Sequence, residues 1–251
     1  MNKNLIDKNS EHKPTRRCMV TIMGEMITFP VGETESAGGY LARPETGDGP
    51  GIIVIQEWWG LIDQIKGVCN RLAAEGFVAL APDLYGGKVV PLEEPDEAAK
   101  AMMSLQLEQA AADMSGAVDL LVEHSSGDRI GVLGFCMGGG LALMLADRRP
   151  DAVAAVIPCY GVHPWPEAHP DYSSLTAATQ IHCAGQDDFF TPAAAEELVG
   201  TLSALGHEVE LHVYPESAHA FFNEDRPEVY DADASALLWT RSLAFLRSHL
   251  G

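Results

Sequence analysis

Residues 130–140, IGVLGFCMGGG, join a run of apolar residues to a cluster of glycines with a cysteine at its start. An apolar run of this kind is typical of a strand buried on both faces. Gly134 and Gly138 flank Cys136 in the pattern G-x-C-x-G, which is the spacing of a sharp strand-to-helix turn that presents a nucleophile on strained backbone. The stretch therefore predicts a thiol at the N-terminus of a helix, where the helix dipole and free N–H groups favour a thiolate and a developing oxyanion.

Outward from this turn, strand-like and helix-like segments alternate along the chain. Apolar runs predict buried strands at 51–56, 77–82, 129–135, 152–158, 179–185 and 207–215. Amphipathic runs predict helices at 64–76, 95–124, 138–148, 193–206 and 228–250. Two short strands at 20–31 and 37–44 are expected to form an antiparallel edge. This order predicts one α/β domain over 19–251, with a mostly parallel central sheet and helices on both faces, after a flexible tail at 1–18.

Composition narrows the functional classes. A formal net charge of −20 disfavours binding to nucleic acids and docking on anionic membranes. The N-terminus has no apolar signal region, and no apolar run approaches the length of a membrane span. The five cysteines are an odd number without a CxxC pair, which argues against a disulfide framework or a zinc site. We expect a soluble cytoplasmic protein without a bound metal, acting as a monomer or homodimer.

The loops after the strands carry the candidate chemical groups, because ligands of such sheets bind at the carboxyl ends of the strands. Cys136 follows one strand, Asp187 and Asp188 follow a later one, and His219 follows the last. A hydrolase of this architecture has its nucleophile, acid and base in that order. Taken alone, G-x-C-x-G fits a buried inert cysteine equally well, so the three loops together carry the prediction. His212 lies within a predicted strand and is expected to be structural.

Several segments resemble the dienelactone hydrolase (carboxymethylenebutenolidase) family of α/β-hydrolases. They are VIQEWWGL, RLAAEGFVALAPDLYGG, GFCMGGG, GQDDFFTP and HAFFNEDRPEVYDADAS, which cover most of the chain from about residue 51 onward in the family's order. The resemblance implies Cys136 as nucleophile, His219 as base and Asp188 as the acid, with Asp187 as the fallback one position away. It also implies that Glu57 contacts the resting thiol and helps to deprotonate it.

The same resemblance implies an oxyanion hole made by the backbone N–H groups of Met137 and Trp58, and no cofactor. The chain departs from the family at the two arginines that hold a substrate carboxylate, since Gly87 and Asn223 stand at those places. Lys88 and Arg226 lie nearby, although lysine lacks the bidentate geometry of arginine. An aromatic pocket is expected around the thiol. The residues expected to contact substrate are Trp59, Tyr85, Lys88, Tyr160, Trp165, Phe222 and Asn223.

These features predict hydrolysis of a small ester or lactone through a thioester acyl-enzyme. Two alternatives remain open at the level of sequence. One is a non-catalytic binding or regulatory protein that keeps the hydrolase scaffold. The other is a redox sensor in which Cys136 is oxidised, with Cys159 or Cys183 as neighbours.

Overall fold

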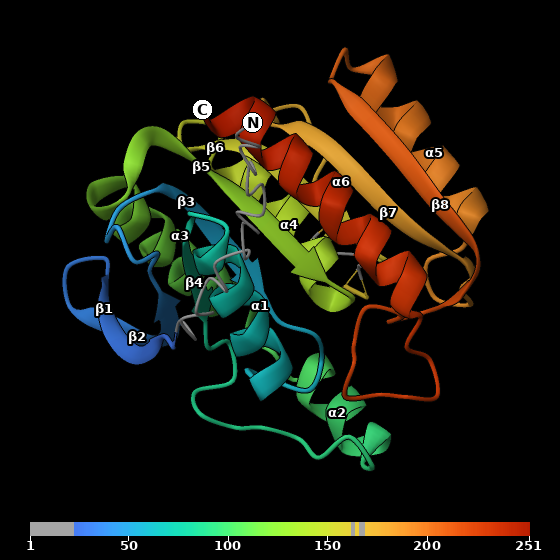
Figure 1. Cartoon of the computed structure of the whole chain (residues 1–251), viewed down its shortest axis with the longest axis horizontal. Helices are drawn as coiled ribbons and strands as arrows, with labels where there is room; N and C mark the ends of the chain where they lie inside the picture. Colours follow the sequence, from blue (N-terminus) through green and yellow to red (C-terminus); the bar gives the residue numbers. More distant parts are fainter. Residues whose placement is uncertain (1–22, 162–163, 166–168) are drawn as a thin grey trace, which may run out of the picture.

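A computed structural model describes residues 23–161, 164–165 and 169–251. The predicted tail at 1–18 lies outside the described residues. Within the described part, eight strands form one sheet in the order β1-β2-β4-β3-β5-β6-β7-β8 (Figure 1). The strands are β1 (Glu25–Val31), β2 (Glu35–Ala42), β3 (Pro50–Ile55), β4 (Val78–Pro82), β5 (Ser126–Phe135), β6 (Val153–Cys159), β7 (Ala178–Gln186) and β8 (Val209–Ala218).

The pairing of these strands confirms the expected sheet. β2 is antiparallel to β1 and β4, whereas every pair from β4 through β8 is parallel. β3 is buried along nearly its whole length and β4 along all of it, as an apolar run between two helical layers must be. The antiparallel edge is therefore formed by β1 and β2, as the sequence predicts.

Helices cover both faces of the sheet. They are α1 (Asp63–Ala74), α2 (Pro95–Met103), α3 (Leu107–His124), α4 (Met137–Arg148), α5 (Pro192–Ala204) and α6 (Ala232–Leu250). α1 and α6 pack into one apolar cluster, and α3, α4 and α5 contribute to the cluster on the opposite face (Figure 1). The single α/β domain with two helical layers is thus confirmed for the described residues.

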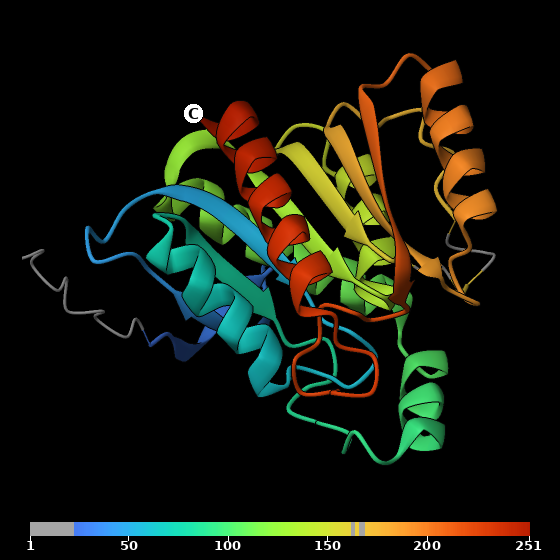
Figure 2. The same cartoon turned by 45° about the vertical axis from the view of Figure 1, so that its right-hand side comes forward.

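The prediction of one helix over 95–124 is wrong. The chain breaks into α2 and α3 at Ser104, whose hydroxyl donates to the backbone carbonyls of Lys100 and Ala101, at 2.8 and 3.1 Å. Such bonding competes with continuation of a helix. The break lets α3 lie along the sheet while α2 stands apart at the carboxyl ends of the strands (Figure 2). The last helix also begins later than predicted, because Asp231 accepts from the N–H of Ala234 as its N-cap.

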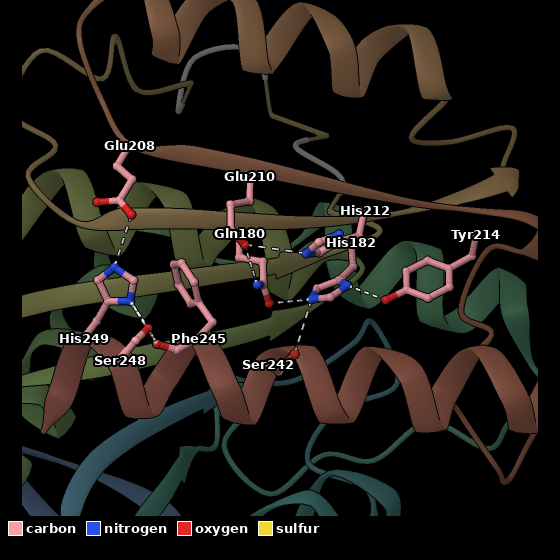
Figure 3. A network of polar contacts seen from close by, with 10 residues as sticks. All are labelled: Gln180, His182, Glu208, Glu210, His212, Tyr214, Ser242, Phe245, Ser248 and His249. Atoms are coloured by element: carbon pink, nitrogen blue, oxygen red, sulfur yellow. Dashed lines mark hydrogen bonds and ion pairs between the residues drawn. The ribbon is translucent and has the colours of Figure 1, made fainter.

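A buried polar network joins α6 to β7 and β8 (Figure 3). The ring of His182 lies 2.8 Å from the Tyr214 hydroxyl and 3.0 Å from the Gln180 side-chain oxygen. Ser242 of α6 contacts the same ring at 3.3 Å. His212 occupies the paired position on β8, so it belongs to the sheet, in agreement with the structural role expected for it.

Candidate active site

The turn between β5 and α4 places Cys136 in strained backbone. Its φ of 53° and ψ of −121° are rare for a residue with a side chain. The flanking glycines are required by space: a Cβ on Gly134 would lie 2.0 Å from the Gly138 carbonyl oxygen, and one on Gly138 would lie 2.5 Å from the Gln56 oxygen. The G-x-C-x-G pattern therefore reflects close contact between backbones, and it presents the thiol at the start of α4.

His219, in the loop after β8, lies beside this thiol. Both residues line the same cavity, and the Nδ1 of His219 lies 2.8 Å from Oδ2 of Asp187. Burial lowers the pKa of His219. The neighbouring Cys136 sulfur and Asp187 raise it by more than burial lowers it, so the pKa is about 10. These contacts favour the protonated form of the His219 ring.

Asp187, and not Asp188, is the aspartate that contacts the histidine. The other oxygen of Asp187 accepts from the N–H groups of Phe189 and Phe190 at 2.8 and 2.9 Å, and the residue is only 4% exposed. The expected contact of Asp188 with the histidine is therefore wrong by one residue, and the fallback residue Asp187 makes that contact. The loop turns at this point, so Asp187 points inward while Asp188 is exposed at the edge of the cavity.

Glu57 is buried in the same site, directly after β3. Its two oxygens accept from the Tyr160 hydroxyl at 3.3 Å and from the Asn223 side-chain amide at 2.9 Å. Burial raises the pKa of Glu57, although Asn223, His219, Arg226 and Tyr160 oppose that shift. Tyr160 and Asn223 are themselves buried. They therefore hold Glu57 in place from the protein interior and do not line the open cavity.

A cavity of about 310 Å³ opens above the thiol. Glu57, Cys136 and His219 lie on its wall. Its remaining lining residues are Trp58, Met102, Gln186, Asp188, Phe189, Ala218, Ala220, Arg226 and Val229. They come from the loop after β3, from α2, and from the segments that follow β7 and β8, which lie at one end of the sheet as the parallel topology requires.

Two backbone N–H groups at this cavity lack a protein acceptor. Neither Trp58 nor Met137 donates its backbone N–H to another residue in the part of the chain that the structure describes. Both residues adjoin groups on the cavity wall, Trp58 next to Glu57 and Met137 next to Cys136. Unpaired N–H groups beside a nucleophile are suited to bind an oxyanion, which agrees with the expected positions.

Comparison with known proteins adds the family. The model of the dienelactone hydrolase family matches residues 37–250. The chain belongs to the dienelactone hydrolase family. Membership confirms the enzyme class expected from the sequence, a hydrolase of esters or lactones.

Individual relatives span almost the whole chain. Protein usf of Aquifex pyrophilus is 35% identical over 91% of this chain and 100% of its own length. A protein of Aquifex aeolicus, provisionally named carboxymethylenebutenolidase, is 30% identical with the same coverage, 91% and 100%. A crystal structure from Klebsiella pneumoniae, provisionally named dienelactone hydrolase, has a TM-score of 0.78 and 27% identity, and the match covers 90% of this chain and 99% of that one.

Several residues expected to contact substrate lie elsewhere in this member of the dienelactone hydrolase family. Trp59, Phe222 and Trp165 are at most 4% exposed and belong to the two apolar clusters. Phe222 stacks on Phe135 with ring centroids 5.3 Å apart. These assignments are wrong because aromatic residues next to active-site loops also complete the core beneath them.

Tyr85 and Lys88 line a neighbouring cavity of about 490 Å³, between α2, α3 and β2. Tyr85 nevertheless lies close to the thiol turn, since its hydroxyl is 3.5 Å from the Met137 sulfur. Neither residue lines the cavity above Cys136, and their expected contact with substrate stays a prediction. Sequence reasoning missed Met102, Phe189 and Val229 as lining residues. Phe189 and Val229 lie in segments that carry the family resemblance, whereas Met102 does not.

The remaining described cysteines are Cys69, Cys159 and Cys183, which are free and buried. Burial raises the pKa of each of these thiols, so they resist ionisation. No group of three or more metal-ligating side chains occurs among the described residues. In the same residues, no helix is long and apolar enough to cross a bilayer.

Proposed function

We propose that this chain hydrolyses a small ester or lactone with Cys136 as nucleophile and His219 as the proton-transfer group, through a thioester intermediate. One observation carries the proposal: His219 lies with Cys136 on the wall of one cavity, and its Nδ1 contacts Asp187 at 2.8 Å. A nucleophile, a base and a residue that orients the base are the parts that acyl transfer requires.

In the first half of the reaction, the thiolate of Cys136 attacks the substrate carbonyl carbon, and the carbonyl π electrons move to oxygen. The backbone N–H groups of Trp58 and Met137 bind this oxyanion, each contributing roughly 3–4 kcal/mol to the transition state. The oxyanion collapses to a thioester and expels the alkoxide, which takes its proton from His219.

In the second half, neutral His219 removes a proton from water, and the resulting hydroxide attacks the thioester carbon. Collapse of this second oxyanion releases the carboxylic acid and returns the thiolate, while Asp187 holds the protonated ring. Glu57 lies on the same cavity wall as the thiol and the ring and interacts with the charge on His219. A buried carboxyl there influences which group holds the proton as substrate enters. Thiolate leaves more readily than an amine, so amides are expected to be poor substrates.

The test is hydrolysis of p-nitrophenyl acetate by purified protein. Cys136→Ala should abolish the ester hydrolysis while the circular dichroism spectrum remains native. Cys69→Ala is the matched control, because that thiol is buried in α1 away from the cavity, and it should retain turnover. Full activity of Cys136→Ala contradicts the proposal.

The redox alternative has its own outcome in the same experiment. A sulfenic acid that forms at Cys136 with peroxide, in protein that hydrolyses none of a panel of aryl esters and lactones, supports a sensor in place of a hydrolase.

A further inference from the structure

The charges around the cavity are unfavourable for an anionic substrate. Among the described residues that line it, Arg226 is the one arginine or lysine, whereas Glu57 and Asp188 supply two carboxyl groups. The other cation on this wall, His219, is paired with Asp187, and Arg226 is paired with Glu228. A substrate carboxylate bound beside the thiol would therefore meet the carboxyl groups of Glu57 and Asp188, with no unpaired cation among the described lining residues.

Arg226 is already engaged. Its Nε and Nη2 atoms lie 2.9 and 2.8 Å from the same oxygen of Glu228. Its guanidinium also lies over the Trp59 ring, 5.7 Å from the ring centroid. A substrate carboxylate must share this cation with Glu228, which weakens the attraction that a free arginine would offer.

Asp188 is the opposite case. It stands exposed at the edge of the cavity, and none of the ion pairs of the described residues involves it. Because Asp187 makes the contact with His219, the carboxylate of Asp188 remains at the entrance of the cavity. The net charge of −20 adds a long-range field of the same sign, which also repels anions.

Apart from Gln186, the other side chains on the cavity wall are apolar. Met102 of α2 and Val229 of the loop before α6 line it together with Phe189. Phe189 is 66% exposed, and its ring lies 5.0 Å from that of His219. An exposed phenylalanine above a reactive pair is a surface that an aryl or alkyl group covers.

We propose that this cavity selects esters or lactones whose bound portion is uncharged and apolar, and that Asp188 is a specificity-determining residue that disfavours a substrate carboxylate. The proposal rests on the proposed hydrolysis at Cys136, and it specifies the substrate class of that site.

The experiment compares two aryl acetates of the same shape, neutral 4-acetoxybenzamide and anionic 4-acetoxybenzoate. Each kcat/KM is divided by the rate of alkaline hydrolysis of that ester, which removes the difference in intrinsic reactivity. The wild-type protein should prefer the neutral ester by about tenfold at low salt, and 0.5 M NaCl should reduce the preference. Asp188→Asn should raise the anionic-to-neutral ratio by about fivefold.

Asp128→Asn is the matched control, because it removes the same charge at the start of β5, the opposite end of the sheet from the cavity. It should leave the ratio at the wild-type value. A wild-type preference for the anionic ester, or a ratio that both variants change equally, overturns the proposal.

A second measurement separates this proposal from the proposed function. The products 4-hydroxybenzamide and 4-hydroxybenzoate are used to protect Cys136 from alkylation by iodoacetamide, which requires no turnover. Stronger protection by the amide, lost in Asp188→Asn, supports the selectivity even in protein that hydrolyses neither ester. Stronger or equal protection by the benzoate contradicts the selectivity, whereas absent turnover contradicts only the hydrolysis.

Discussion

His219 has two neighbours, Cys136 and Asp187, that both raise the pKa of its ring. The Cys136 sulfur supplies negative charge on one side of the ring, and Asp187 fixes the orientation of the ring from the other. Because the folded pKa is about 10, the ring carries its proton at neutral pH in the free enzyme. In the proposed reaction, this protonated ring is the group that protonates the leaving alkoxide.

Asp187→Asn should lower kcat for p-nitrophenyl acetate by roughly 10²–10⁴-fold, because the ring loses the group that orients it. In the wild-type protein, kcat/KM should fall as pH rises through about 10, where His219 loses its proton. Removal of the Asp187 charge lowers the pKa of His219, so this limb of the pH profile should move to lower pH. A larger kcat loss in Asp188→Asn than in Asp187→Asn would contradict the assignment.

Glu57→Gln tests the buried carboxyl. The amide keeps the size of the side chain but removes its titration and its interaction with the charge on His219. We expect lower turnover of p-nitrophenyl acetate and slower alkylation of Cys136 by iodoacetamide, both measured at the same pH. If neither rate changes, Glu57 serves only to fill the space between Tyr160 and Asn223.

At the scale of elements, the turn from β5 to α4 determines where the thiol lies. The start of α4 packs against the end of β3 so closely that no side chain fits at Gly138, where a Cβ would lie 2.5 Å from two backbone oxygens. The separation of α2 from α3 is the second such feature, since it brings Met102 to the cavity.

Gly138→Ala should therefore destabilise the protein by about 1–3 kcal/mol or more, since the clash is with backbone that cannot rotate away. The matched control is Gly200→Ala in α5, where nothing lies within 4 Å of an added Cβ. That substitution should stabilise the protein by about 0.4–1 kcal/mol through the unfolded state and helix propensity. Urea denaturation measures both, and equal effects at the two positions would contradict the steric argument.

At the scale of the whole molecule, α6 is attached to the last two parallel strands through polar contacts at His182 (Figure 3). Burial lowers the pKa of His182 well below the model-peptide value of 6.5, and the charges of His212 and Arg241 act in the same direction. Glu210 faces this group as well, through Gln180 and His212. The network therefore requires a neutral ring.

This requirement predicts an acid-sensitive fold. Below about pH 6.5 the unfolded chain binds a proton at His182 that the folded chain does not, so this contribution to stability is lost as pH falls. The free energy of unfolding in urea should decrease from pH 7 to pH 5, and His182→Gln should reduce the slope although it lowers stability at pH 7. An unchanged slope in the variant would assign the acid sensitivity to other groups.

Local sequence was enough to identify most of the sheet and the thiol turn. Apolar runs bounded by turns predict β3 to β6 within a few residues, because burial on both faces requires continuous apolar sequence. The two glycines around Cys136 likewise report a local backbone constraint. The family motifs add Glu57, which lies on the wall of the same cavity as Cys136 and His219.

Only the tertiary structure decided in which direction individual side chains point. Whether Asp187 or Asp188 faces His219 depends on how one loop turns, and neighbouring aspartates look alike in sequence. Whether an aromatic side chain is buried or exposed depends on packing. Packing buries Trp59 and Phe222 but leaves Phe189 exposed at the entrance of the cavity. Sequence determined which backbone and which reactive groups this protein has, because those are encoded by local patterns; the walls and charges of its cavity arise from contacts between distant segments, which no local pattern records.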